Sequence, residues 1–145
     1  MRRAPDTLTA DMFEIPHEAG NLPGALNINT QLRALISDEI KRSTHSRYQL
    51  AARMSELLGH EVSKHQLDAW TAESREGWRF PLEYLPALEV ALETHALTRF
   101  IADLRGCRIL VGREALEAEL GKIEKQKREL ARREKALKKV LGEDE

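Results

Sequence analysis

The stretch that decides the fold is residues 46–70, SRYQLAARMSELLGHEVSKHQLDAW, because it contains two helix starts and one helix stop. Ser46 and Ser63 are each followed three residues later by a glutamine, which is the spacing of a capping box. Between them, apolar side chains recur at helical spacing, at Leu50, Ala51, Met54, Leu57 and Leu58. Gly59 can adopt the left-handed conformation that ends a helix. The sequence therefore predicts two capped helices around a tight turn, the second ending near Glu73.

Helical patterns continue on both sides of this stretch. Before it, the segment from Thr30 to Arg42 places Leu32, Leu35, Ile36 and Ile40 on one helical face. After it, Pro81 and Pro86 each suit the first turn of a helix, so two helices are expected to meet at Pro86. A further helix is expected to end at Gly106. Together these elements predict an all-α fold.

Three segments follow from this organisation. Residues 1–29 contain prolines and glycines without sustained periodicity and are expected to form an irregular leader. Residues 30–112 form the helical domain, and residues 113–145 form a long C-terminal helix. The short apolar run 107–111 is compatible with coil or with a strand, and its Cys107 is expected to be buried.

Two helices joined by a short turn also match the pattern of a helix-turn-helix. Small Ala51 would lie where the helices cross, Val62 would fill the turn, and Leu67 and Trp70 would face the core. The side chains expected to point outward, toward a DNA major groove, are Lys64, His65, Asp68, Ala69 and Thr71. Any all-helical protein contains capped helices at turns, so spacing alone leaves both DNA binding and a purely architectural turn open.

A resemblance favours DNA binding. The segments RYQLAA (residues 47–52) and VSKHQLDAW (residues 62–70) resemble the lambda-repressor-like helix-turn-helix superfamily. The segment FPLEYLPAL (residues 80–88), following Trp70, resembles regulatory proteins of Mu-like phages and their prophages. The chain departs from the compact motif by roughly one and a half extra helical turns before Val62. The resemblance implies a helix-turn-helix domain over residues 30–112 whose third helix binds DNA.

Candidate DNA-binding residues follow from this resemblance and from the basic side chains of the next loop. They are Arg47, Gln49, Ser63, Lys64, His65, Gln66, Asp68, Arg75 and Arg79. Lys64 can donate to guanine or phosphate, whereas Ser63 and Gln66 can bond phosphate oxygens at a helix N-terminus. Arg75 and Arg79 suit phosphate contacts, with solvated loop charges as the alternative.

Two residues of this region have competing interpretations. Asp68 could accept only from a cytosine amine and would be repelled by phosphates, so we favour an ion pair with Lys64 or Arg75. Trp78 could lie on DNA or cover the core, and its neighbour Phe80 favours the core.

The C-terminal helix carries a heptad pattern that predicts a coiled coil. Its seam positions are Leu116, Leu120, Ile123, Lys127, Leu130, Glu134, Leu137 and Leu141. A parallel pair would set Lys127 against Lys127 and Glu134 against Glu134, and the flanking pairs Glu119–Glu124 and Arg133–Lys138 would also repel. An antiparallel pair brings Lys127 near Glu134 of the partner subunit. We therefore predict a homo-oligomer, dimer or tetramer, with antiparallel helices.

Two other interpretations of this helix remain open. A single amphipathic helix that folds back on its own domain needs the same apolar stripe. The segment from Lys122 to Lys139 holds nine basic and three acidic residues, which suits DNA-backbone contact, although a solvated surface is the preferred explanation.

Composition limits the remaining classes of function. The 145 residues include 23 basic and 24 acidic side chains, and a chain of this length cannot be a large multi-domain enzyme. Charge is nevertheless segregated, with -3 over residues 1–40, +2 over 41–80, -1 over 81–112 and +1 over 113–145. A single cysteine excludes an intramolecular disulfide, and the five histidines show no metal-ligand spacing. Neither a nucleotide-binding loop nor a nucleophile motif is present, so we expect no enzyme activity, metal or cofactor.

The leading hypothesis is a sequence-specific DNA-binding transcriptional regulator, encoded by a phage or prophage and oligomerised by its C-terminal helix. Its expected partner is double-stranded DNA, and its expected location is the cytoplasm of a bacterial host cell, since no signal-peptide or membrane-spanning pattern is present. The alternatives are a DNA-recognition or loader component of a packaging or transposition assembly, and a structural helical adaptor.

Overall fold

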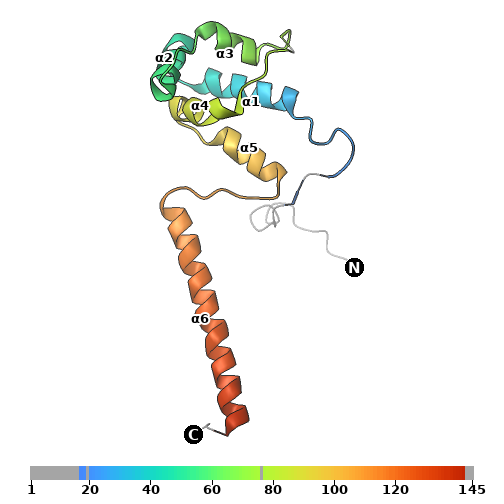
Figure 1. Cartoon of the computed structure of the whole chain (residues 1–145), viewed down its shortest axis with the longest axis vertical. Coiled ribbons are helices and arrows are strands. Elements are labelled where there is room, and N and C mark those ends of the chain that lie inside the picture. Colours follow the sequence, from blue (N-terminus) through green and yellow to red (C-terminus); the bar gives the residue numbers. More distant parts are fainter. Residues whose placement is uncertain (1–16, 19, 76, 143–145) are drawn as a thin grey trace, which may run out of the picture. The chain divides into compact units, whose positions relative to one another are not determined.

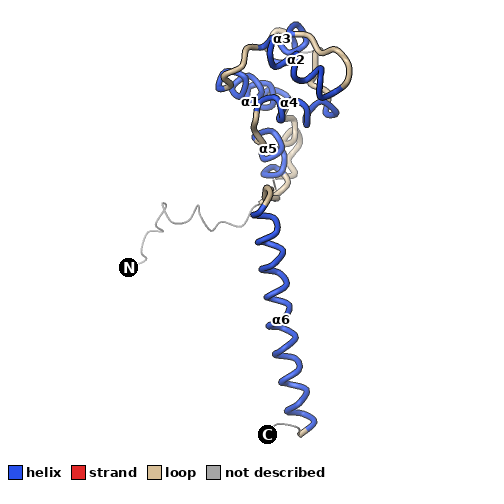
Figure 2. Tube along the Cα trace, turned by 90° about the vertical axis from the view of Figure 1, so that its left-hand side faces the viewer, coloured by secondary structure: helices blue, strands red, loops and turns tan. Residues whose placement is uncertain are grey.

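The computed structural model describes residues 17–18, 20–75 and 77–142, and it forms two compact units. The first unit ends at Arg108 and holds five α-helices among its described residues, and the second begins at Ile109 and holds one (Figure 1). The helices of the first unit are α1 (Asn29–Arg42), α2 (Arg47–Leu58), α3 (Lys64–Thr71), α4 (Leu85–Leu92) and α5 (Ala96–Leu104), with a 3-10 helix, η1 (Leu82–Tyr84), before α4. Figure 2 shows the described residues as helix and loop only, which confirms the predicted all-α class.

The core of the first unit lies between α2 and the helices packed around it. Helix α2 contacts α3 and α4, while α1 contacts α3 and α5. The buried apolar side chains are Ile36, Ile40, Leu50, Ala51, Met54, Val62, Leu67, Trp70, Ala87, Leu88, Ala91 and Leu97. The predicted inward positions Ala51, Val62, Leu67 and Trp70 are all among them. Burial of these side chains fixes which face of α3 remains outside.

Both predicted capping boxes are present. At the start of α2, the Ser46 hydroxyl accepts from the Gln49 N–H at 3.2 Å, and the Ser46 N–H donates to Gln49 Oε1 at 2.8 Å. At the start of α3, Ser63 and Gln66 form the same two bonds at 3.2 and 2.8 Å. Gly59 ends α2 with φ of 75°, as predicted. The short segment between α2 and α3 is held at its start by the Gly59 N–H, which donates to the carbonyl oxygen of Ser55 at 2.9 Å, and at its end by the Ser63 capping box.

The hydroxyl group of Ser55 forms hydrogen bonds across the turn between α2 and α3. Ser55 Oγ donates to the carbonyl oxygen of Ala51 at 2.8 Å, and it accepts from the Val62 N–H at 2.8 Å. Since Ser55 lies on α2 and Val62 precedes α3, the bond ties the two helices together across the turn. The longer connection noted in the sequence is thus held in one conformation by a side chain of α2.

The helices after the loop differ in part from the prediction. Pro86 lies in the first turn of α4, as predicted, but the element before it is the three-residue η1 rather than an α-helix. Helix α5 receives a cap from another helix: Glu89 of α4, only 7% exposed, accepts from the Thr98 N–H at 2.8 Å and from Thr98 Oγ1 at 2.7 Å. The buried carboxylate thereby satisfies a donor at the start of α5.

The segment after α5 corrects one expectation. Cys107 is exposed rather than buried, and residues 107–111 form coil with no strand. Gly106 just before it has φ of 67°, and a Cβ there would lie 2.8 Å from the backbone nitrogen of Glu18. Glycine is therefore required at position 106.

The second unit contains α6 (Arg113–Leu141), a single helix of 29 residues. Its N-terminal and C-terminal neighbours are Gly112 and Gly142, both with positive φ. No residue of α6 is buried. None of the described helices combines the length and apolar composition that a membrane span requires.

Candidate nucleic-acid interface

The outer surface of α3 is polar around its first turn. Leu67, Ala69 and Trp70 are buried, so the opposite side of the helix carries Lys64 and His65. These two residues, together with Tyr48, Ser63 and Asp68, line a shallow depression of about 380 Å³. The expectation that Ala69 points outward is wrong, because this methyl group is 1% exposed and packs inside. The exposed face is thus limited to the first two turns of α3 and the start of α2.

Asp68 holds two of the candidate cations. Its Oδ2 lies 2.7 Å from Lys64 Nζ, one turn earlier on α3, and its Oδ1 lies 3.0 Å from Arg47 Nη1 on α2. Arg47 Nη1 also donates to Thr71 Oγ1 at 3.0 Å, which leaves Thr71 half-buried. Of the two expected partners, Lys64 forms the ion pair. Arg75 does not, and Arg47, not considered as a partner from the sequence, takes that place.

The same contacts shift two pKa values in opposite directions. The hydrogen bond from Lys64 lowers the pKa of Asp68 below its ordinary value, and the positive charges of Lys64 and Arg47 act in the same sense. The hydrogen bond to Asp68 correspondingly raises the pKa of Lys64. Lys64 Nζ also lies 5.4 Å from the centre of the exposed Tyr48 ring. At neutral pH both partners are charged, and the carboxylate partly neutralises this basic surface.

The loop after α3 is held in place by Arg33, a residue that sequence analysis missed. Arg33 lies on α1, is 7% exposed, and donates through its guanidinium to main-chain carbonyl oxygens of the segment 69–78. These acceptors belong to Ala69, Ala72, Arg75 and Trp78. A detectable signal existed in the sequence, since Arg33 lies on the same helical stripe as Ile36 and Ile40. A lone cation on an apolar stripe indicates a buried hydrogen-bonding partner.

The fixed loop presents an aromatic and a basic side chain beside α3. Trp78 is 44% exposed, so the expectation that it covers the core is wrong. Its ring instead meets the His65 ring edge-on, with centroids 6.0 Å apart. Arg75 Nη1 lies 3.2 Å from His65 Nε2. Phe80 takes the place against the core that the sequence suggested for Trp78, with its ring 5.2 Å from that of Trp70.

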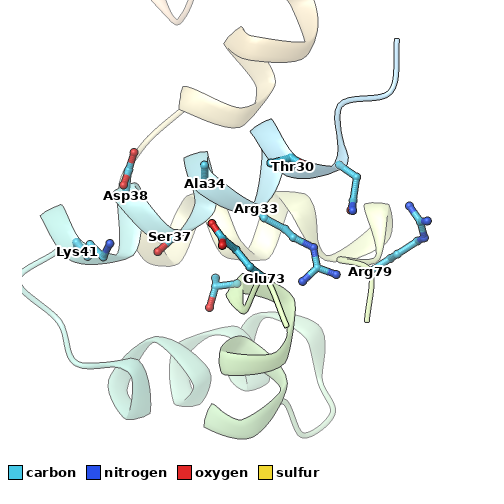
Figure 3. Close-up of a pocket in the computed structure, with 10 residues that line it drawn as sticks. Thr30, Arg33, Ala34, Ser37, Asp38, Lys41, Glu73 and Arg79 are labelled. Atoms are coloured by element: carbon cyan, nitrogen blue, oxygen red, sulfur yellow. The ribbon is translucent and has the colours of Figure 1, made fainter. Parts of the chain in front are cut away.

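The remaining candidate residues fall into two groups. Ser63, Gln49 and Gln66 take part in the capping boxes, in which each glutamine accepts through Oε1. Arg79 lies away from this group, on a groove of about 550 Å³ between α1 and the chain after α3 (Figure 3). The structure therefore brings Arg47, Ser63, Lys64, His65, Asp68 and Arg75 together, and it places Arg79 on another surface.

The groove in Figure 3 has mixed charge. Figure 3 shows the Arg33 side chain extending from α1 toward the chain that follows α3, with Glu73 nearby and Asp38 and Lys41 further along α1. Both acidic and basic groups line it, so it lacks the single sign of charge expected at a phosphate-binding surface. Among the described residues, no group of three or more His, Cys, Asp or Glu side chains is placed to hold a metal ion.

Helix α6 presents an apolar stripe of its own. The large exposed apolar side chains at seam positions are Leu116, Leu120, Ile123, Leu130, Leu137 and Leu141, with exposures from 44% to 73%. Ion pairs on other faces of the helix join Lys122 to Glu119 at 3.3 Å and Arg128 to Glu124 at 4.0 Å, and Glu134 of the seam pairs with Lys138 at 2.7 Å. The hydrogen bond from Lys138 lowers the pKa of Glu134. The helix is thus amphipathic.

The chain was compared with protein-family models, with curated proteins and with solved structures. No family model, no curated protein and no solved structure matches the chain significantly.

Proposed function

We propose that the protein binds double-stranded DNA in a sequence-specific manner through the first turn of α3 and acts as a transcriptional regulator. The proposal rests on the clustering of hydrogen-bond donors around one short helix. Lys64, His65 and Arg75 meet at its outer face, while its inner face is anchored by buried Leu67 and Trp70. An α-helix of this kind fits the width of a B-DNA major groove.

The chemistry of the cluster suits base and phosphate contacts. Lys64 donates to guanine or phosphate, and His65 donates or accepts according to its tautomer. The amide NH2 group of Gln66 can turn toward a phosphate near the helix N-terminus, because the capping box uses its Oε1. The helix-turn-helix arrangement of α2 and α3 is part of this proposal, as is the phage or prophage origin that the sequence resemblance suggests.

The proposal also includes self-association. Residues 41–80, which contain α2 and α3, carry seven basic and five acidic side chains, and Asp68 occupies two of the basic ones. One such surface makes few phosphate contacts, so its affinity for DNA is low. Linking two copies through α6 raises the effective concentration of the second DNA-binding surface and compensates for this weakness.

The test is DNA binding by a double variant and a matched control. Random double-stranded DNA is first bound at low salt, and a preferred site is then selected from a random pool. Lys64→Ala with His65→Ala should lose preference for that site while the circular dichroism spectrum is unchanged. The control, Lys41→Ala with His45→Ala, removes the same residue types from exposed positions near the end of α1 and should bind normally. Preference retained by the Lys64 and His65 variant would contradict the assignment to α3.

A structural helical adaptor is the main alternative class. Such a protein has no need for DNA, so it would show no binding to random DNA even at low salt. A loader component of a packaging or transposition assembly would bind DNA equally well. A reporter assay separates it from a regulator, since only the regulator changes transcription from a promoter that carries the selected site.

A further inference from the structure

The apolar stripe of α6 is exposed to solvent and can be covered by a partner helix. Six large apolar side chains recur along it at spacings of three and four residues, with Lys127 and Glu134 filling the two remaining seam positions. A two-stranded coiled coil covers such a stripe with an equal stripe, and a second copy of this chain supplies one. The charges along α6 decide how the two copies are oriented.

A parallel pair of α6 helices brings like charges together. In register, Lys127 meets Lys127 of the partner subunit, and Glu134 meets Glu134 of the partner subunit. The flanking positions add Glu119 against the partner's Glu124, and Arg133 against the partner's Lys138. Each of these contacts occurs between side chains of the same sign and is unfavourable at short distance.

One antiparallel register covers the whole seam. It places Leu116 opposite the partner's Leu141, Leu120 opposite the partner's Leu137, Ile123 opposite the partner's Glu134, and Lys127 opposite the partner's Leu130. By symmetry, each contact occurs twice. A shift by one heptad in one direction leaves Leu116 and Leu120 beyond the end of the partner helix. In the other direction it sets Leu137 opposite the partner's Arg113 and leaves Leu141 beyond the start of the partner helix. The register is therefore fixed by the apolar residues at both ends.

The charged positions agree with the same register. Lys127 and the partner's Glu134 lie one helical turn apart, within the reach of a lysine side chain. Glu117 lies beside the partner's Lys138, which also pairs with Glu134 of its own chain at 2.7 Å. The other flanking contacts bring no like charges together: they are Glu119 with the partner's Val140, Glu124 with the partner's Ala131, and Gln126 with the partner's Arg133.

We infer that two copies of α6 pair in this antiparallel register, so that the N-terminal ends of the two helices, to which the first units are connected, lie at opposite ends of a two-stranded rod. The first unit precedes α6 in each chain, and the two Arg113 residues of the pair are separated along the rod by about 46 Å, at 1.5 Å per residue. The two proposed DNA-binding surfaces are therefore connected to opposite ends of the rod. This consequence for DNA rests on the proposed function, whereas the pairing itself does not.

Spin-label distances in the full-length chain test the register. In a Cys107→Ser background, a label at Glu114→Cys should give a distance of about 45 Å between the two copies. A label at Glu129→Cys, close to the centre of the pairing, should give a distance of roughly 20 Å or less, because helix axes in such pairs lie 8–10 Å apart. Short distances at both positions would mean parallel helices and would overturn the inference.

A second readout separates failure of the inference from failure of the proposed function. Light scattering on the same labelled proteins gives the mass, and a monomer without dipolar coupling would remove the pairing altogether. Binding of random DNA at low salt is measured in parallel. DNA binding by a monomeric or parallel protein would retain the DNA-binding surface of α3 and reject only the antiparallel rod.

Discussion

Replacement of Asp68 by asparagine tests the proposed contact between the surface of α3 and DNA. In the folded protein the Asp68 carboxylate lies 2.7 Å from Lys64 Nζ and 3.0 Å from Arg47 Nη1. Asparagine has nearly the same shape and no charge, so Asp68→Asn releases both cations without leaving a cavity. The released cations become available to DNA phosphates, and we expect non-specific DNA affinity to rise.

The size of this effect follows from counterion release. Each additional phosphate contact adds about 0.9 to the slope of log K against log salt concentration. One new contact therefore raises affinity at 0.1 M salt about 8-fold relative to a 1 M reference, and two new contacts raise it about 60-fold. The expected slope is steeper by about 0.9 to 1.8.

The assay is fluorescence anisotropy of a labelled random duplex, titrated at several salt concentrations. Glu83→Gln is the matched control, since it removes the same charge from an exposed position on η1. This control should leave the slope unchanged. An unchanged slope in Asp68→Asn, or an equal rise in the control, would refute the idea that Asp68 restrains Lys64 and Arg47.

Three further predictions follow from the structure. The pKa of Asp68 is lowered in the folded state, so its contribution to stability is present above the unfolded pKa of 3.8 and is lost as pH falls through the folded pKa. Between pH 5 and pH 2, urea unfolding should therefore show a smaller loss of unfolding free energy for Asp68→Asn than for the native chain. Arg33→Ala should lower the free energy of unfolding by about 2–4 kcal/mol, because it leaves carbonyl oxygens without the donor that the guanidinium provides. A decrease below about 0.5 kcal/mol in chemical denaturation would contradict the role of Arg33 in holding the loop. Leu130→Glu should convert the protein to a monomer, as measured by light scattering, whereas Glu129→Gln on the outer face should not. A dimer that persists in Leu130→Glu would show that the seam of α6 is not the contact between the two copies.

Local signals explain why much of the fold was predictable. Capping boxes at Ser46 and Ser63, the glycine stop at Gly59 and the proline at Pro86 each act within one or two helical turns, and the structure confirms all four. The inward positions of α3 also followed from helical periodicity. Ala69 was the exception, because its small side chain carries little hydrophobic signal and its burial depends on how α1 packs against α3.

The parts that were not predictable depend on residues far apart in the chain. Arg33 bonds to carbonyl oxygens 36 to 45 residues away, and this bonding holds the loop that exposes Trp78. Glu89 caps a different helix through Thr98. Neither pairing has a local pattern that would reveal its partner. The candidate residues of α2, α3 and the following loop were thus named from the sequence, whereas the conformation of that loop was not predicted.

The central claim is that the outer face of α3 distinguishes one DNA sequence from another. The most direct measurement is the affinity of the native chain for a duplex selected from a random pool and for a scrambled duplex of the same composition, at physiological salt. A specific regulator should bind the selected duplex at least about 1,000-fold more tightly. Equal affinity for the two duplexes, or failure of the pool to converge on any sequence, would contradict the claim.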